Sequence, residues 1–426
     1  MQPDDLRRGK KSITQDYIFD LLLLILSSLH IIYGLVSISM WVMLAALLLM
    51  TVLRQNFKMS VDGCIKYWWA FAIWSIVGIV YTNDTTYAIG YVLKIIVLVF
   101  TLSYYSNEDN SDRTFGILKI IILIWISTII LELFFPSQIR VIRTAISTSS
   151  EGNLETIERA ISLLGTKYGV FSDPAVGAFF CACGIGLGIG FLIEKKKLLG
   201  WAWIVFSAIG IVLTNKRGPM LSVALASGLV YLIRSSTTVK KKIERVIIVF
   251  VVIAVVIFLF THNQTLVNWF ARVNQNQYSN RNRQNLYITL YNNFLKHPIL
   301  GSGTKSTRVL LNGTDGHNIY LAALSENGIL GLVLLLVGFV SGLKNTISIM
   351  RDFDSLRDRK LNGVITFCLF TQIYIICYGM TGNPMTTIYS LAMYFMCLGI
   401  PLREHRLLRA GYFDAPSYVD GDVERE

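Results

Sequence analysis

The chain has 426 residues, of which 53% are hydrophobic and only 15% are charged, and its formal net charge is +12. Soluble domains carry about 25% charged residues, so this composition predicts an integral membrane protein and excludes an ordinary soluble enzyme. The positive charge does not indicate a nucleic-acid partner, because the basic residues lie in short segments between apolar runs, where they set membrane topology.

Apolar runs of about 17 to 21 residues recur along the chain, and each is long enough to cross a bilayer as a helix. They predict an all-α polytopic protein with about twelve transmembrane helices in a single integral membrane domain, residues 1–426. The predicted spans are about 17–34, 36–53, 65–81, 86–105, 115–135, 174–193, 198–213, 219–234, 246–261, 317–343, 362–380 and 385–401.

The basic residues predict how these spans are oriented. With the N-terminus inside, most of the 39 Lys and Arg residues fall on the cytoplasmic side, which predicts N-in/C-in topology. The extracytoplasmic side then holds a loop at 136–173 and a large loop at 262–316, between spans nine and ten. Residues 402–426 form a cytoplasmic tail.

Several cations stay on the outer face against this bias, which indicates an anionic ligand there. Long loops are translocated whatever their charge, but that explanation does not cover Lys216 and Arg217 in the tight turn after span seven. Lys94 lies in the middle of span four. A buried lysine is costly, so Lys94 is expected either to pair with a carboxylate or to face an anionic substrate.

The outer loops contain two apolar stripes, at 154–164 and 286–294, that predict short helices lying on the membrane surface. Pro298 ends the second helix, and Gly301 and Gly303 provide a flexible turn. In span six, glycines recur at spacing four, which predicts close helix packing.

A helix predicted to begin at His317 would place its positive dipole end at the membrane surface. That end disfavours a protonated imidazole, so His317 could accept a proton, and phosphate could bind at the same helix end. The alternative is that His317 only anchors the span. Asp315 could orient the imidazole or act as a base, or be a plain turn residue. For Asp173, helix capping is favoured over catalysis.

A histidine base beside outward-facing arginines suits group transfer from a phosphorylated donor to a hydroxyl group. The outer loops contain no Asp-x-Asp pair, and the histidines do not have metal-ligand spacing. A metal site is therefore not implied.

The motifs resemble those of the O-antigen ligase and polymerase superfamily of bacterial membrane glycosyltransferases. The match covers about residues 165–345, with Tyr287 where tryptophan is frequent and Lys216 where a small hydroxyl residue often stands. The matching positions are Asp173-Pro174, Lys216-Arg217-Gly218, Arg283-x-x-Leu286-Tyr287, Pro298-x-x-Gly301-x-Gly303, His317-Asn318 and Gly328-x-x-Gly331.

The resemblance implies a donor glycan linked to undecaprenyl diphosphate, bound from the periplasmic face of the bacterial inner membrane. By position, Arg217 and Arg283 would bind the diphosphate, and His317 would activate the acceptor hydroxyl. Lys216, Arg281 and Lys94 are further expected substrate-binding residues, and Arg281 could replace Arg283. The family's transfer is regarded as metal-independent and inverting, with no cofactor.

Two activities are open within the family. A polymerase of O-antigen, capsule or exopolysaccharide repeat units uses a second lipid-linked glycan as acceptor, and a ligase uses the lipid A core. The polymerase is favoured because that role is the more varied of the two. A chain-length regulator and a flippase of the same pathway are expected partners. A transporter of lipid-linked glycan or of a small anion is the alternative from another class, although it should show internal repeats and charges near the midplane.

Overall fold

The computed structural model of the protein describes residues 61–107, 111–146, 165–171, 173–234, 277–356 and 359–409. Outside these ranges lie the predicted spans 17–34, 36–53 and 246–261, the apolar stripe 154–164 and residues 410–426 of the predicted tail. The regular structure within the described ranges is entirely helical. Its helices are α4 (Ile65–Ile79), α5 (Thr85–Tyr105), α6 (Ser111–Phe134), α7 (Pro136–Ile146), α9 (Pro174–Ile193), α10 (Lys197–Leu213), α11 (Arg217–Ile233), α14 (Gln277–Lys296), α15 (Thr307–Leu310), α16 (Ile319–Leu356), α17 (Arg359–Tyr378) and α18 (Ile388–Arg409).

Each predicted span within the described ranges coincides with a helix, which confirms the all-helical prediction. Five of these helices are long and apolar enough to cross a membrane, and α4, α10 and α11 are shorter apolar helices. The number of twelve spans and the N-in/C-in orientation stay predictions. The five long apolar segments are Thr85–Tyr105, Arg113–Phe134, Pro174–Ile193, Ile319–Arg351 and Arg359–Tyr378.

Two helices differ in extent from the prediction. The helix expected from His317 begins two residues later, because the side chain of Asn318 caps it, and it continues to Leu356. The last helix continues to Arg409, through the first part of the predicted tail. Leu402 and Leu407 are buried in this extension, so packing against the bundle keeps it helical.

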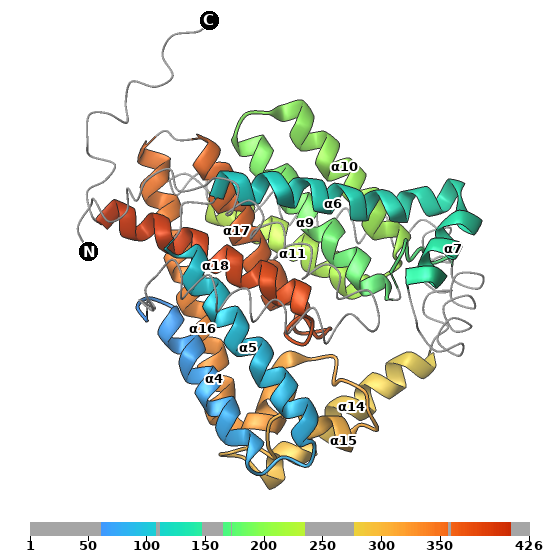
Figure 1. Ribbon diagram of the computed structural model, residues 1–426, viewed down its shortest axis with the longest axis vertical. Helices are drawn as coiled ribbons and strands as arrows, with labels where there is room; N and C mark the ends of the chain where they lie inside the picture. The colour runs from blue at the N-terminus through green and yellow to red at the C-terminus, as the bar shows by residue number, and fades with distance from the viewer. Residues whose placement is uncertain are drawn as a thin grey trace, which may run out of the picture.

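Helix α9 is the centre of one half of the bundle, where α6, α10, α11 and α17 surround it (Figure 1). A Cβ atom at Gly184 would lie 2.2 Å from Ser207 Oγ of α10, and one at Gly190 would lie 2.8 Å from the carbonyl oxygen of Gly363 of α17. The glycines of span six therefore let two neighbouring helices approach closely, as predicted.

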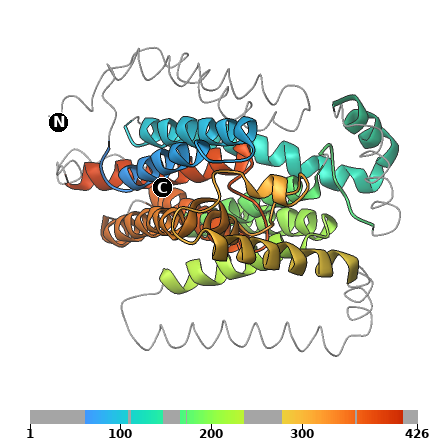
Figure 2. The same ribbon diagram turned by 90° about the horizontal axis from the view of Figure 1, so that it is seen from below.

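The second half of the bundle contains α4, α5, α16 and α18. Helices α4 and α5 lie on one side of α16, and α14 lies on the other (Figure 2). Trp68 of α4 is buried in an aromatic cluster with Phe339 of α16 and with Tyr394 and Phe395 of α18, at ring-centroid distances of 4.8 to 5.7 Å. This cluster joins three helices that are far apart in sequence.

The loop predicted at 136–173 is organised by a buried ion pair between Glu132 of α6 and Arg143 of α7. The second carboxylate oxygen of Glu132 accepts hydrogen bonds from the backbone N–H groups of Tyr168 (2.7 Å) and Gly169 (2.8 Å). Arg143 Nε donates to the carbonyl oxygen of Gly169 at 2.8 Å. Arg143 is one of the cations of the predicted outer loop 136–173, but its charge holds the protein's own loop instead of an anionic ligand.

Helix α16 is broken at Gly328, where φ is 65° and ψ is −169°. Only glycine adopts this backbone conformation without strain. A Cβ atom there would lie 2.1 Å from the carbonyl oxygen of Ile299, and the backbone N–H of Ile329 donates to the carbonyl oxygen of Pro298 at 3.0 Å. The predicted span 317–343 runs through Gly328 without interruption, and the structure corrects this to a helix broken at that residue.

The turn at 298–303 occupies the break and is held there by hydrogen bonds. Ser302 N donates to Ser325 O at 3.0 Å, and Gly303 N donates to Glu326 O at 2.9 Å. These carbonyl groups end the first part of α16, where they have no partner in the next helical turn. The turn was expected to be flexible. Instead its backbone N–H groups hold it in place by donating hydrogen bonds to the carbonyl groups at the break in α16.

We expect Gly328→Ala to destabilise the protein by roughly 2–5 kcal/mol, because alanine meets both a forbidden backbone conformation and a contact with the 298–303 turn. Thermal unfolding of the purified protein in detergent measures this effect. Gly116→Ala on α6 is the matched control, since nothing lies within 4 Å of a Cβ atom there. Equal unfolding temperatures for the two variants would contradict the role of Gly328.

Candidate functional site

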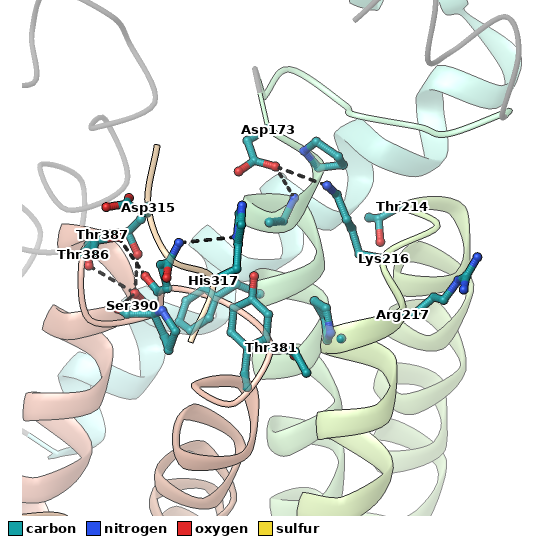
Figure 3. A pocket seen from close by; sticks show the side chains of 18 of the residues that line it. Asp173, Thr214, Lys216, Arg217, Asp315, His317, Thr381, Thr386, Thr387 and Ser390 are labelled. Carbon is teal, nitrogen blue, oxygen red and sulfur yellow. Dashed lines mark hydrogen bonds and ion pairs between the residues drawn. The ribbon is translucent and has the colours of Figure 1, made fainter. Parts of the chain in front are cut away.

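A cavity of about 560 Å³ lies where α9, α11 and α16 begin and where α17 connects to α18 (Figure 3). The residues that line it come from sequence segments between 166 and 390. Most of the predicted substrate-binding and catalytic residues are among them. The ionisable residues in its lining that carried the sequence argument are Asp173, Lys216, Arg217, Arg283, Asp315 and His317.

His317 stands immediately before α16, in a left-handed backbone conformation with φ of 51°. Its carbonyl oxygen accepts a hydrogen bond from the Tyr287 hydroxyl at 3.2 Å, which ties it to α14. Its ring nitrogen Nδ1 lies 3.4 Å from Nδ2 of Asn383. The imidazole is thus oriented from two directions, by α14 through the backbone and by the α17–α18 connection through the ring.

The start of α16 does not offer free backbone donors to a phosphate group. Asn318 Oδ1 accepts from the N–H groups of Tyr320 and Leu321, each at 3.0 Å, and Ile319 N donates to the carbonyl oxygen of Gly379 at 2.9 Å. The expectation that phosphate could bind at this helix end is therefore wrong, because the protein itself uses these groups.

Lys216 and Arg217 stand at the start of α11, and no side chain caps that end of the helix. Lys216 Nζ lies 3.9 Å from Asp173 Oδ1, and the same carboxylate oxygen caps α9 by accepting from Ala175 N at 2.8 Å. Capping was the favoured reading for Asp173, and this contact confirms it. The guanidinium of Arg217 points away from His317, beyond Lys216 (Figure 3).

Arg283 approaches the cavity from α14 and is exposed. Arg281 lies two residues earlier in the same helix, but its side chain is outside the described part of the chain.

The pKa of His317 is lowered from its ordinary value, first by burial and then by the positive charge of Arg283. The Asp315 carboxylate opposes this shift, and Lys216 adds to it. Burial and a neighbouring cation both disfavour the imidazolium form. The lowered pKa favours the neutral imidazole at pH 7, with burial and Arg283 as the largest causes.

Asp315 lines the cavity beside His317, and its Oδ1 lies 3.6 Å from Lys305 Nζ. Glu326 of α16 is buried and accepts a hydrogen bond from the Thr307 hydroxyl. Lys94 Nζ donates to the carbonyl oxygen of Thr386 at 3.5 Å, so Lys94 lies behind the cavity wall.

The wall of the cavity opposite Lys216 is neutral and polar, and sequence reasoning missed it. It comes from the connection between α17 and α18, to which the sequence analysis assigns no role. Tyr378 and Tyr389 add two aromatic rings to this wall. Its hydroxyl and amide side chains are those of Thr381, Asn383, Thr386, Thr387 and Ser390.

The comparisons with known proteins agree with the motif analysis. Residues 202–336 match the model of a family described as O-antigen ligase, which confirms the predicted resemblance. This segment includes Lys216, Arg217, Arg283 and His317, and it extends across the helix break at Gly328. A search of curated proteins found no match.

We expect Arg283→Gln to raise the pKa of His317, because the substitution removes a positive charge that disfavours protonation of the imidazole. A histidine-selective NMR titration measures the pKa, with His317→Asn identifying the resonance. Lys296→Gln, an exposed position on the same helix, is the control and should leave the titration unchanged. An unchanged pKa in Arg283→Gln would show that the two side chains do not interact.

Proposed function

We propose that this protein is a membrane glycosyltransferase acting on undecaprenyl-diphosphate-linked glycans, because residues 202–336 match the model of a family described as O-antigen ligase. The observation that carries the proposal is a single cavity holding a neutral histidine together with Lys216, Arg217 and Arg283. A general base and a cluster of cations are the groups that glycosyl transfer from a diphosphate donor requires.

The proposed reaction is a single displacement at the anomeric carbon of the donor sugar. An acceptor hydroxyl attacks that carbon while the bond to the diphosphate oxygen breaks, so the configuration inverts. His317 takes the hydroxyl proton, and undecaprenyl diphosphate leaves with the bonding electron pair. The cations of the cavity stabilise the charge that develops on the leaving group, and the proposed step uses neither a cofactor nor a metal.

The two walls of the cavity suggest where each substrate lies. The diphosphate would bind at the start of α11, where Lys216, Arg217 and the helix dipole all favour an anion. The acceptor sugar would lie against the neutral wall, whose hydroxyl, amide and aromatic groups suit a polyhydroxylated ring. His317 lies between the two walls, next to Asn383.

Asn383 would set the proton position on the imidazole. If its amide oxygen faces Nδ1, it accepts the Nδ1 proton and leaves Nε2 free to take a proton from the acceptor. A rotation of the Asn383 amide group by half a turn exchanges its oxygen and nitrogen, and would place the oxygen where Nδ2 now contacts His317 Nδ1.

The position of the cations favours an enzyme over a transporter. Lys216, Arg217 and His317 stand at the ends of α11 and α16, at one end of the bundle. A transporter would be expected to hold such groups near the middle of its spans. We propose that this end faces the periplasm of a bacterial inner membrane, with both chain termini inside, and that the transmembrane part forms one domain.

Two acceptors fit this chemistry. We propose the repeat-unit polymerase as the first candidate. The second candidate is the ligase, which attaches glycan to the lipid A core, and it is kept because the matched family is described as O-antigen ligase. Reconstitution of the purified protein with lipid-linked repeat units tests the activity itself. Chain growth without another glycosyltransferase supports the polymerase, and transfer only to added lipid A core supports the ligase. Movement of substrate across the membrane without a new glycosidic bond would exclude both.

We expect His317→Asn to lower the rate of transfer by roughly 10²–10⁴-fold, which is the usual contribution of a general base. Asparagine tolerates the left-handed backbone of this position, so folding should be retained. His297→Asn, on an exposed turn, is the control. Since only neutral His317 accepts a proton and its pKa is lowered, the wild-type rate should stay constant near pH 7 and fall only in more acidic solution. Full activity in His317→Asn would remove the histidine from the mechanism.

We expect substitutions on the two walls to affect different substrates. Lys216→Gln should mainly raise the KM for the lipid-linked donor, because it removes a charge from the proposed diphosphate site. Thr387→Val should mainly raise the KM for the acceptor, since it removes only a hydroxyl group from the side of the cavity away from Lys216 (Figure 3). Steady-state kinetics with each substrate varied separately distinguish the two effects. Identical changes in both variants would argue against separate walls.

A further inference from the structure

A small second cavity, of about 30 Å³, lies next to the first. Asp315 and Asn383 line both cavities, so the two spaces share part of their walls. The small cavity extends from this shared part toward α5 and the first part of α16, where Lys305 and Glu326 line it. It therefore contains charged groups that the proposed reaction does not use, directly behind the residues that surround His317.

The backbone of Lys305, between the 298–303 turn and α15, is fixed by its neighbour. Its φ is 60°, a left-handed conformation that is strained for a residue with a side chain. Thr304 N donates to the carbonyl oxygen of Gly78 at 3.1 Å, and Thr304 Oγ1 donates to that of Ser75 at 2.8 Å. Both acceptors lie on α4. The side chain of Lys305 therefore starts from a point that is anchored to a helix of the bundle.

The side chain of Lys305 is largely buried, with 11% of its surface accessible. Its Nζ lies 4.8 Å from the centre of the Tyr91 ring on α5 and 3.6 Å from Asp315 Oδ1. Glu326 lines the same cavity, but its carboxylate accepts a hydrogen bond from the Thr307 hydroxyl. A buried ammonium group requires partners of this kind. Lys305 thus connects α5 to Asp315, because the ring holds the ammonium group and the ammonium group holds the carboxylate.

Asp315 stands two positions before His317, and both side chains line the first cavity (Figure 3). Burial lowers the pKa of His317 most, followed by the charge of Arg283; the Asp315 carboxylate opposes this shift. Lys216 lowers this pKa further and Asp173 raises it, both less than Asp315 does. The Asp315 side chain is 40% exposed, so without a partner its carboxylate would turn into solvent. Its effect on His317 therefore depends on what holds it.

Two more cations lie near this pair, but neither takes the place of Lys305. Lys94 Nζ donates to a backbone carbonyl oxygen of the α17–α18 connection at 3.5 Å. The Arg308 guanidinium lies 3.3 Å from the centre of the Tyr87 ring on α5, and Arg308 lines neither cavity. Lys305 and Arg308 thus both pack on a tyrosine of α5, and of the two it is Lys305 that forms an ion pair with Asp315.

We propose that Lys305 is a positioning residue for the transfer reaction, which holds the Asp315 carboxylate where its charge stabilises the imidazolium form of His317. When His317 takes the proton of the acceptor hydroxyl, the proton stays on the imidazole and Asp315 remains ionised. The nearby negative charge favours the protonated base and so favours the transfer. This inference rests on the proposed function, because it assigns Lys305 a part in the step that His317 would carry out.

A histidine-selective NMR titration of the full-length protein in detergent tests the positioning and requires no substrate. Asp315→Asn should lower the pKa of His317, because it removes a carboxylate that raises it. Lys305→Met keeps an unbranched side chain of similar size and should lower the pKa in the same way, since the carboxylate is no longer held. If Lys305 only screened the carboxylate, its loss would raise the pKa. A raised or unchanged pKa in Lys305→Met would therefore overturn the proposal.

Two further variants separate positioning from a loss of folding. Lys305→Arg retains the positive charge and should keep the pKa of His317 near that of the wild type. Arg308→Met is the matched control, because it removes a cation that also packs on a tyrosine of α5 but lines neither cavity. It should leave the pKa unchanged. An equal fall in Arg308→Met would assign the effect to disturbed packing against α5, which overturns the proposal.

Transfer rates in the reconstituted system give a second measurement. Lys305→Met and Asp315→Asn should each lower the rate by roughly 2–10-fold, as expected when a general base is weakened by about one pKa unit. The double variant should be no slower than Asp315→Asn, because Lys305 acts through Asp315. Effects that multiply in the double variant would overturn the proposal. Absence of transfer by the wild type would instead contradict the proposed function, and the titration would still decide whether Lys305 positions Asp315.

Discussion

The break in α16 at Gly328 is the constraint on which the geometry of the main cavity depends. It divides the helix into a short first part, from Ile319 to Asn327, and a long second part. The short part is about 14 Å long, so it sets a fixed distance between His317 and the turn that fills the break. His317 is positioned by hydrogen bonds at both ends of this unit: the Tyr287 hydroxyl binds its carbonyl oxygen, and the 298–303 turn binds the last carbonyl groups of the short helix.

The affinity of each helix start for an anion depends on whether a side chain already accepts hydrogen bonds from its backbone N–H groups. Asp173 caps α9 and Asn318 caps α16, so the protein's own oxygens already bind backbone donors at these two ends. Helix α11 begins with Lys216 and has no side-chain cap. An uncapped helix start that carries cations attracts an anion more strongly than the two capped ends do. This difference supports the proposed diphosphate site at α11, with His317 beside it.

The sequence was sufficient to locate the long apolar helices of the described ranges and four ionisable residues that line the cavity: Lys216, Arg217, Arg283 and His317. Apolar runs are long and regular, and Lys216, Arg217 and His317 contrast with their surroundings. Local chemistry could not reveal the partners that only the fold brings together. Arg143 had the same charge as the other outer cations, and its pairing with Glu132 depends on how α7 turns back onto α6. Gly328 was recognised, but a glycine within an apolar run does not distinguish close packing from a helix break.

The neutral wall of the cavity could not be predicted from the sequence either, in this case because its residues carry no distinctive charge. Thr381, Asn383 and Ser390 carry no charge, and short polar turns between helices are common, so nothing in this segment distinguishes it from an ordinary connection. Its importance follows from its closeness to His317. Asn383 and His317 are 66 positions apart in sequence, but Nδ2 of Asn383 lies 3.4 Å from Nδ1 of His317. A catalytic base requires an orienting partner, and a glycan requires neutral hydrogen-bonding groups. One uncharged turn supplies both the contact to the His317 ring and the neutral wall proposed for the acceptor, so under this proposal a change in that turn alters acceptor binding without altering the donor site.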